Sequence, residues 1–175
     1  NNMDDVMCER VFAPNMDMVN LMREHNFPLY TLESFSKVSD CDFVGFTIQF
    51  EMCLTTVLLM LDLAGIPFLA KDRTEDDPLV VCGGPCTCNP EPFADFFDLM
   101  MLGEGEEVLP HLMELYKNSS SKKDFLIKSS EVTGVYIPNL EEIKQEKVEK
   151  SIIESMNNVY TIKKPEIGRA SCRER

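Results

Sequence analysis

The chain has 175 residues, of which 44% are hydrophobic, and this is enough for one globular domain with its own core. Its formal net charge is -13, with 17 Lys and Arg against 30 Asp and Glu. A protein that binds the phosphates of a nucleic acid needs an excess of basic residues, so this charge argues against such a partner.

Targeting and redox signals point to the cytoplasm. No stretch reaches the roughly 18 to 20 consecutive apolar residues of a membrane span, and the opening residues lack a basic and then apolar signal pattern. The 7 cysteines are odd in number and scattered, which argues against a disulfide framework. We therefore expect a cytoplasmic protein with reduced thiols and no membrane partner.

The first part of the chain predicts two short strands with a helix between them. Residues 8–14 (CERVFAP) and residues 28–34 (PLYTLES) are the predicted strands. Asn15 can cap a helix that runs to about His25.

The middle of the chain predicts further strands and a long helix. A nearly continuous apolar run at residues 42–50 (DFVGFTIQF) is typical of a parallel strand that is buried on both faces. The helix that follows it ends at Gly65, with Pro67 just beyond. Residues 79–84 (LVVCGG) and 98–103 (DLMMLG) predict two more strands.

A second helix is expected from about Glu106 to Tyr116, with Pro110 in its first turn. Strands that alternate with helices form a parallel sheet with helices on both sides. We therefore predict an α/β fold of the Rossmann or flavodoxin type, with a mostly parallel sheet and flanking helices. Residues 118–165 carry a weaker pattern and are predicted to be a connector or small add-on.

Three turns follow the predicted strands, at residues 47–51, 82–92 and 103–107. Ligands of open α/β sheets bind beyond the carboxyl ends of the strands. We therefore expect the three turns to lie along one edge of the sheet, which we call the rim. The candidate ligand-binding residues on the rim are Thr47, Gln49, Gly83, Gly84, Pro85, Gly103, Glu104 and Gly105.

Each rim turn has a functional and a purely structural interpretation. Thr47 and Gln49 offer a hydroxyl and an amide, and the paired glycines let the backbone approach a ligand, although a plain tight turn explains them equally. Glu104 or Glu106 could accept hydrogen bonds from ribose, or could complement a helix dipole. Neither glycine turn is a G-x-G-x-x-G or a P-loop.

Cys82, Cys86 and Cys88 have the spacing C-x3-C-x-C, one residue short of the C-x3-C-x2-C that holds the four-iron cluster of radical S-adenosylmethionine (SAM) enzymes. A cluster needs thiolates that converge from an open loop, whereas Cys82 ends a buried strand. Neither His25 nor His111 stands at zinc spacing from these thiols. We therefore predict structural thiols and no metal site. A metal-sensing or redox protein that uses these three thiols is kept as an alternative hypothesis.

The chain resembles the amino-terminal domain of a family of radical SAM proteins. The blocks that carry the resemblance occur in the order ERVFAP, PLYTLES, DFVGFTIQFE, TVLLMLDLAGIPF and DDPLVVCGGPCTCNPEPFADFFDLMMLGEGEE. The likeness runs from about Cys8 to Tyr116 and more loosely to Pro165, and the block from Asp76 to Glu107 is its specific part.

The resemblance implies a cobalamin-binding-like, Rossmann-type domain whose GGPC and GEGE loops face the cofactor or the catalytic barrel. The Asp-x-His-x-x-Gly motif, whose histidine ligates cobalt in related proteins, does not occur in this sequence. If cobalamin binds this domain, it therefore binds without a cobalt-ligating histidine from that motif.

The resemblance also implies the function: an accessory N-terminal domain of a radical SAM iron-sulfur enzyme. The 4Fe-4S cluster and SAM would belong to a barrel of the same parent chain, and no catalytic residue is expected here. The alternative is a stand-alone module that binds a nucleotide or cobalamin on the rim without catalysis.

The resemblance divides the chain into three parts. Residues 1–117 are the partial domain, 118–165 lead toward the barrel, and 166–175 are a non-native tail. One back-translation of Ile167–Arg175 reads as a common sequencing-library adapter, so this tail is excluded from fold reasoning. We further expect a strand and helix before Asn1 and the cluster motif beyond about Pro165.

Overall fold

The computed structural model describes residues 3, 5–140, 145 and 147–153. The four strands of its sheet are β1 (Phe43–Thr47), β2 (Leu79–Gly83), β3 (Leu99–Met101) and β4 (Val135–Tyr136). The α-helices are α1 (Met16–Glu24), α2 (Cys53–Ala64), α3 (Val108–Lys117) and α4 (Lys122–Ser129). Short 3-10 helices cover Val38–Asp40, Ala70–Asp72, Pro85–Cys88 and Glu91–Phe96.

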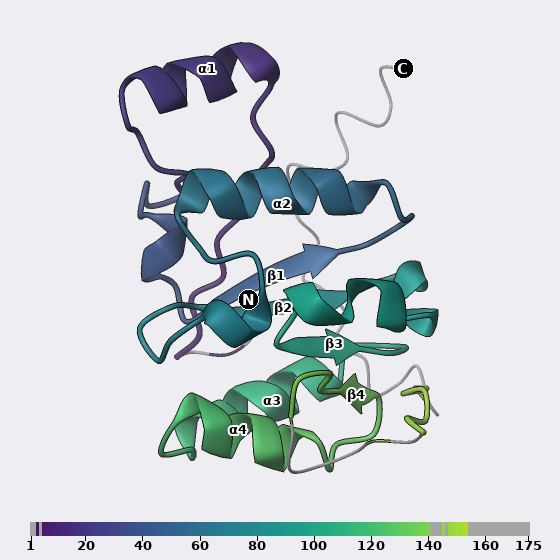
Figure 1. The fold of residues 1–175 in the computed structure, drawn as a ribbon. Coiled ribbons are helices and arrows are strands. Elements are labelled where there is room, and N and C mark those ends of the chain that lie inside the picture. The colour runs from purple at the N-terminus through teal and green to yellow at the C-terminus, as the bar shows by residue number, and fades with distance from the viewer. Residues whose placement is uncertain (1–2, 4, 141–144, 146, 154–175) are drawn as a thin grey trace, which may run out of the picture.

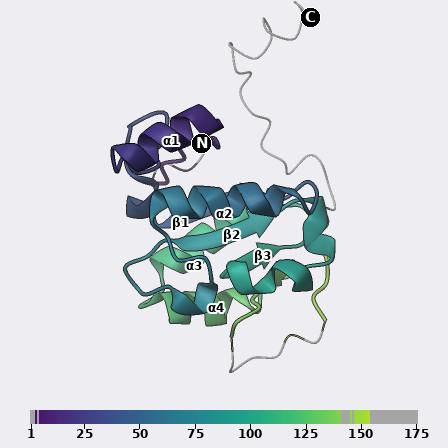
Figure 2. The same ribbon diagram turned by 45° about the horizontal axis from the view of Figure 1, so that its top comes forward.

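The sheet forms the middle layer of the molecule, with strand order β1-β2-β3-β4 (Figure 1). Helix α2 covers one face, while α3 and α4 cover the other. Helix α1 lies against α2 and away from the sheet, as Figure 2 also shows, and an Arg23–Asp62 ion pair of 2.7 Å joins the two helices. The predicted α/β fold with a mostly parallel sheet is confirmed.

The register places the three predicted turns along one edge. Strands β1 and β2 are parallel, with Thr47 opposite Gly83, and β2 and β3 are parallel, with Cys82 opposite Met100. Strand β4 runs antiparallel to β3. Because β1, β2 and β3 point the same way, their carboxyl ends share an edge, and this edge is the rim.

Alternate residues of the strands face two separate hydrophobic clusters. The cluster under α2 includes Val44, Val80, Cys82, Met100, Val57 and Leu61. The cluster under α3 and α4 includes Leu79, Val81, Leu99, Val108, Leu112 and Phe125. Burial on both faces explains why β2 reads as a continuous apolar run.

The predicted start of α1 and the predicted end of α2 are confirmed. The Oδ1 atom of Asn15 accepts the N–H of Met18 at 3.0 Å and caps α1. Helix α2 ends at Gly65, whose φ of 71° lies in the left-handed region. The Ile66 N–H then donates to the Leu61 carbonyl at 3.0 Å, as in a glycine-terminated helix.

The strands predicted at residues 8–14 and 28–34 are wrong. In the second segment the Leu29 N–H donates to the carbonyl of Leu63 in α2 at 3.0 Å, and Tyr30 makes only an isolated bridge with Lys37. The first segment contacts the second, since the Leu32 N–H donates to the Arg10 carbonyl at 2.9 Å. These backbone groups find partners outside the sheet, so neither segment extends it.

Residues 122–140 contribute two elements that sequence patterns did not reveal. The Ser121 hydroxyl accepts the Asp124 N–H at 3.1 Å and caps α4, whose Phe125 is fully buried. Strand β4 then pairs with β3 in the same sheet. The boundary at residue 117 stays a prediction, and the tail at 166–175 lies outside the described residues.

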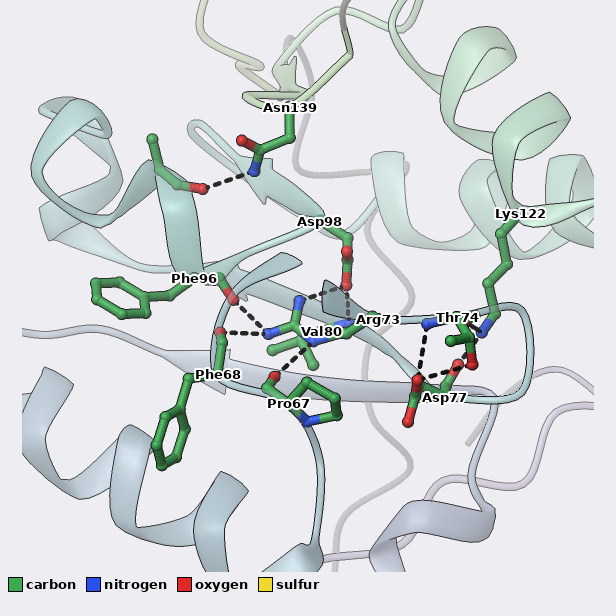
Figure 3. Close-up of polar contacts among 11 residues, drawn as sticks. Pro67, Phe68, Arg73, Thr74, Asp77, Val80, Phe96, Asp98, Lys122 and Asn139 are labelled. Atoms are coloured by element: carbon green, nitrogen blue, oxygen red, sulfur yellow. Dashed lines mark hydrogen bonds and ion pairs between the residues drawn. The ribbon is translucent and has the colours of Figure 1, made fainter. Parts of the chain in front are cut away.

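A buried polar cluster centred on Arg73 holds the edge opposite the rim (Figure 3). The Arg73 guanidinium pairs with Asp98 at 2.8 Å and donates to the carbonyls of Pro67, Phe68 and Phe96. Asp98 also accepts the N–H of Val80 at 2.7 Å. Burial raises the pKa of Asp98 and lowers that of Arg73, and their mutual attraction opposes both shifts. The cluster fixes the starts of β2 and β3 relative to the loop after α2.

Candidate functional site

The turns after β1 and β2 are joined through their backbones. The Ile48 N–H donates to the Gly83 carbonyl at 2.8 Å, and the Ile48 carbonyl accepts the Cys86 N–H at 3.2 Å. Thr47 and Gln49 flank Ile48 and are exposed. Among the described residues neither of their side chains has a hydrogen-bond partner, so a hydroxyl and an amide are available on this part of the rim.

The two glycines of the second turn differ in what they require. Gly84 has a φ of 103°, and a Cβ there would lie 2.7 Å from the Ile48 carbonyl oxygen. Its lack of a side chain is therefore explained by the neighbouring turn alone. A Cβ at Gly83 would meet nothing closer than the Met101 Cε at 3.7 Å, which is an ordinary contact. Pro85 follows and opens the 3-10 helix Pro85–Cys88, as a fixed φ favours.

Thr87 is a structural residue of the rim that sequence reasoning missed. Its side chain is almost fully buried, and its Oγ1 lies 2.8 Å from the carbonyl oxygens of both Gly84 and Met101. The hydroxyl thereby links the second turn to the end of β3. A threonine between two cysteines gave no sequence signal for this role, because the contact depends on the neighbouring strand.

The third turn contacts a later segment of the same chain. Gly103 forms an isolated parallel bridge with Ser151. The Glu104 N–H donates to the Ser151 carbonyl at 3.0 Å, and the Glu104 carboxylate accepts the N–H of Ile153 at 2.5 Å. The Gly105 carbonyl accepts the Leu109 N–H at 2.8 Å in the first turn of α3. Two of the predicted ligand-binding residues, Gly103 and Glu104, therefore already bind the protein's own backbone.

The three cysteines of the second turn lie in different environments. Cys82 is 1% exposed, and burial raises the pKa of its thiol to about 12. Burial also raises the pKa of Cys86, and the negative charge of Glu51 acts in the same direction. Cys88 is exposed, and all the described cysteines are free thiols. No group of three or more His, Cys, Asp or Glu side chains in the described part of the chain is arranged to hold a metal ion.

The fold and the rim agree with the comparison to known families. Residues 1–138 match the sequence model of the family described as radical SAM proteins, N-terminal. The chain belongs to this family. The match covers β1 to β4 and all three rim turns, so the resemblance seen in the sequence is confirmed.

The radical SAM N-terminal domain has a distant relative among curated proteins. It is 27% identical over 131 residues to an uncharacterized protein of Methanocaldococcus jannaschii. The aligned region is 72% of this chain but 24% of that protein, so the chain spans about a quarter of the relative's length. No solved structure matches the chain. Every helix in the described residues is too short or too polar to cross a bilayer.

Proposed function

We propose that this radical SAM N-terminal domain is an accessory domain of a cytoplasmic iron-sulfur enzyme, with the catalytic barrel elsewhere in the parent chain. The family match over residues 1–138 is the observation that carries the proposal. In the parent, a four-iron cluster would supply the electron that cleaves SAM reductively. The domain would support that reaction without supplying a reacting group.

The described residues do not fit a cluster of their own. A cluster is held by thiolates that converge from an open loop, whereas Cys82 is 1% exposed. Cys82 also lies within the core cluster under α2, so it cannot converge with Cys86 and Cys88 on an exposed iron without leaving that core. We therefore propose that other residues of the parent hold the cluster.

We further propose that the rim is the face that meets the cofactor or the barrel. Ligand sites of open α/β sheets lie at this edge. Thr47 and Gln49 offer exposed polar groups there, and Gly83, Gly84 and Pro85 form the adjoining turn. Gly105 adjoins the Met101 side chain between the second and third turns. Gly103 and Glu104 contribute to this face through the segment around Ser151 that they bind.

The first experiment compares the chain with its intact parent. After anaerobic reconstitution, the parent should contain about four iron and four sulfide per polypeptide and should release 5′-deoxyadenosine from SAM under reduction. The chain alone should do neither. A cluster held by the chain alone, or a parent that never cleaves SAM, would refute the proposal. Tight binding of cobalamin or a nucleotide by the chain, with no activity in the parent, would favour the stand-alone module.

A second experiment tests the orientation of the rim. Thr47→Arg adds a bulky cation to the exposed rim, and Asp76→Arg adds the same side chain before β2, on the opposite edge. If the rim faces the barrel or a cofactor, Thr47→Arg should lower SAM cleavage by the parent, while Asp76→Arg should leave it unchanged. Equal effects of the two variants would contradict this placement.

A further inference from the structure

A narrow slot lies between the end of β3 and the start of β4. Gly103 follows β3 with a φ of 103°, and Gly134 precedes β4 with a φ of 84°. The two sides are tied together, because the Leu102 N–H donates to the Gly134 carbonyl at 2.7 Å. No side chain projects from either glycine, so a third backbone can approach both.

Ser151 fills this slot with its backbone. A Cβ at Gly103 would lie 2.2 Å from the Ser151 carbonyl oxygen, and a Cβ at Gly134 would lie 2.7 Å from the Ser151 Cβ. Contacts under 3.0 Å do not occur between real Cβ atoms and backbone, so either substitution would displace the segment. Both glycines are therefore matched to this occupant.

Three backbone N–H groups fix the segment in an extended direction. The Ser151 N–H donates to the Leu102 carbonyl at 2.9 Å, and the Glu104 N–H donates to the Ser151 carbonyl at 3.0 Å. The Ile153 N–H then donates to the Glu104 carboxylate. The pattern is that of a short parallel strand added to a sheet, in which main-chain groups provide the affinity.

The side chains show which kind of segment the slot accepts. A Cβ at Gly134 would meet the Ser151 Cβ, so the glycine leaves room for the side chain at position 151. The next residue points outward, since Ile152 is 71% exposed. The third residue needs a free N–H for Glu104, which excludes proline.

We propose that Gly103, Glu104 and Gly134 form a docking slot for an extended segment of the same chain, Ser151–Ile153, and that this slot fixes where the chain leaves the sheet. The slot brings Ile153 to the rim, next to the third turn. Gly103 and Glu104 are then specificity residues for a peptide backbone, and the part of the rim around Thr47 and Gln49 remains open. The proposal goes beyond the proposed function, because it uses neither a cluster nor a barrel.

Amide hydrogen exchange, followed by NMR on the whole chain, tests the slot. The amides of Ser151, Glu104 and Ile153 should be protected in the unaltered protein. Gly103→Ala should speed their exchange at least about tenfold, which corresponds to the net loss of one hydrogen bond. Gly65→Ala is the matched control, because its φ is also positive at 71° while a Cβ there meets nothing within 4 Å. It should leave the three amides unchanged.

A second variant separates the slot from the stability of the turn. Ser151→Pro removes the N–H that donates to Leu102 and leaves the sequence of the rim intact. It should release the segment, while the Ile48 and Cys86 amides that join the first two turns stay protected. Unprotected Ser151 and Ile153 amides in the unaltered chain would overturn the proposal. Unchanged protection of the Glu104 and Ile153 amides in Ser151→Pro would also overturn it. Either failure would leave the iron and SAM measurements on the parent unaffected.

Discussion

Replacing Arg73 by methionine should lower the free energy of unfolding by about 3 to 5 kcal/mol. The side chain of Arg73 is 4% exposed and that of its partner Asp98 is 10% exposed, so water cannot replace the lost contacts. Methionine fills a similar length but donates no hydrogen bond. The change therefore leaves a buried carboxylate without its counter-charge and the carbonyls of Pro67, Phe68 and Phe96 without this donor.

A double variant shows how much of this loss comes from the unpaired charge. Asp98→Asn removes the charge but keeps an oxygen that can accept the Val80 N–H. Arg73→Met combined with Asp98→Asn should therefore be less destabilised than the sum of the single variants, by at least about 1 kcal/mol. Lys71→Met, at an exposed position in the same loop, is the control and should change stability by less than about 0.5 kcal/mol.

Urea unfolding followed by far-UV circular dichroism provides these free energies. A cost of Arg73→Met below about 1 kcal/mol, the range of an exposed ion pair, would contradict a buried pair. Simple addition of the effects of the two single variants would also contradict it, because the two side chains would then act independently.

Two further predictions concern the rim and its thiols. Gly84→Ala should lower the free energy of unfolding in urea by about 2 to 3 kcal/mol, and Gly65→Ala should lower it by about 1 kcal/mol. Both glycines have a positive φ, but only a Cβ at Gly84 would meet the Ile48 carbonyl. Equal losses in the two variants would contradict this contact. Cys82 should resist iodoacetamide at about pH 8, because its thiolate forms only as the pH approaches its pKa of about 12. The exposed Cys88 should react before Cys82 in peptide mapping, and native labelling of Cys82 as fast as Cys88 would contradict its burial.

Local signals were sufficient to predict the centre of the fold. The run at residues 42–50 contains β1, but this strand lies at one edge of the described sheet and is not buried on both faces as expected. The glycine at 65 ends α2 in the left-handed conformation. The residues of β2 are apolar in succession, as a strand covered on both faces requires. In each case the physical cause lies within a few residues, so one sequence contains it.

The errors occur where an element depends on a distant partner. Residues 28–34 contain β-formers, but their backbone groups bond to the end of α2, to Arg10 and to Ser36, so no strand forms. Strand β4 has two residues, and it is defined by its pairing with Met100 and Met101 in β3. Neither outcome can be read from local propensity, because both depend on which backbone lies alongside.

The position of the rim could be predicted from the sequence, but the neighbours of its glycines could not. Its position followed from the rule that parallel strands end together, and the structure places the three turns on one edge. A glycine in such a turn, however, shows only that some backbone or ligand comes close. At Gly84 the neighbour is Ile48, and at Gly103 it is Ser151. The Glu104 side chain likewise binds Ile153, which is 49 residues away in the sequence. At Gly83, which ends β2, no close backbone contact within the described residues explains the glycine. A contact from outside the domain is therefore best sought beside Gly83 and the exposed Thr47.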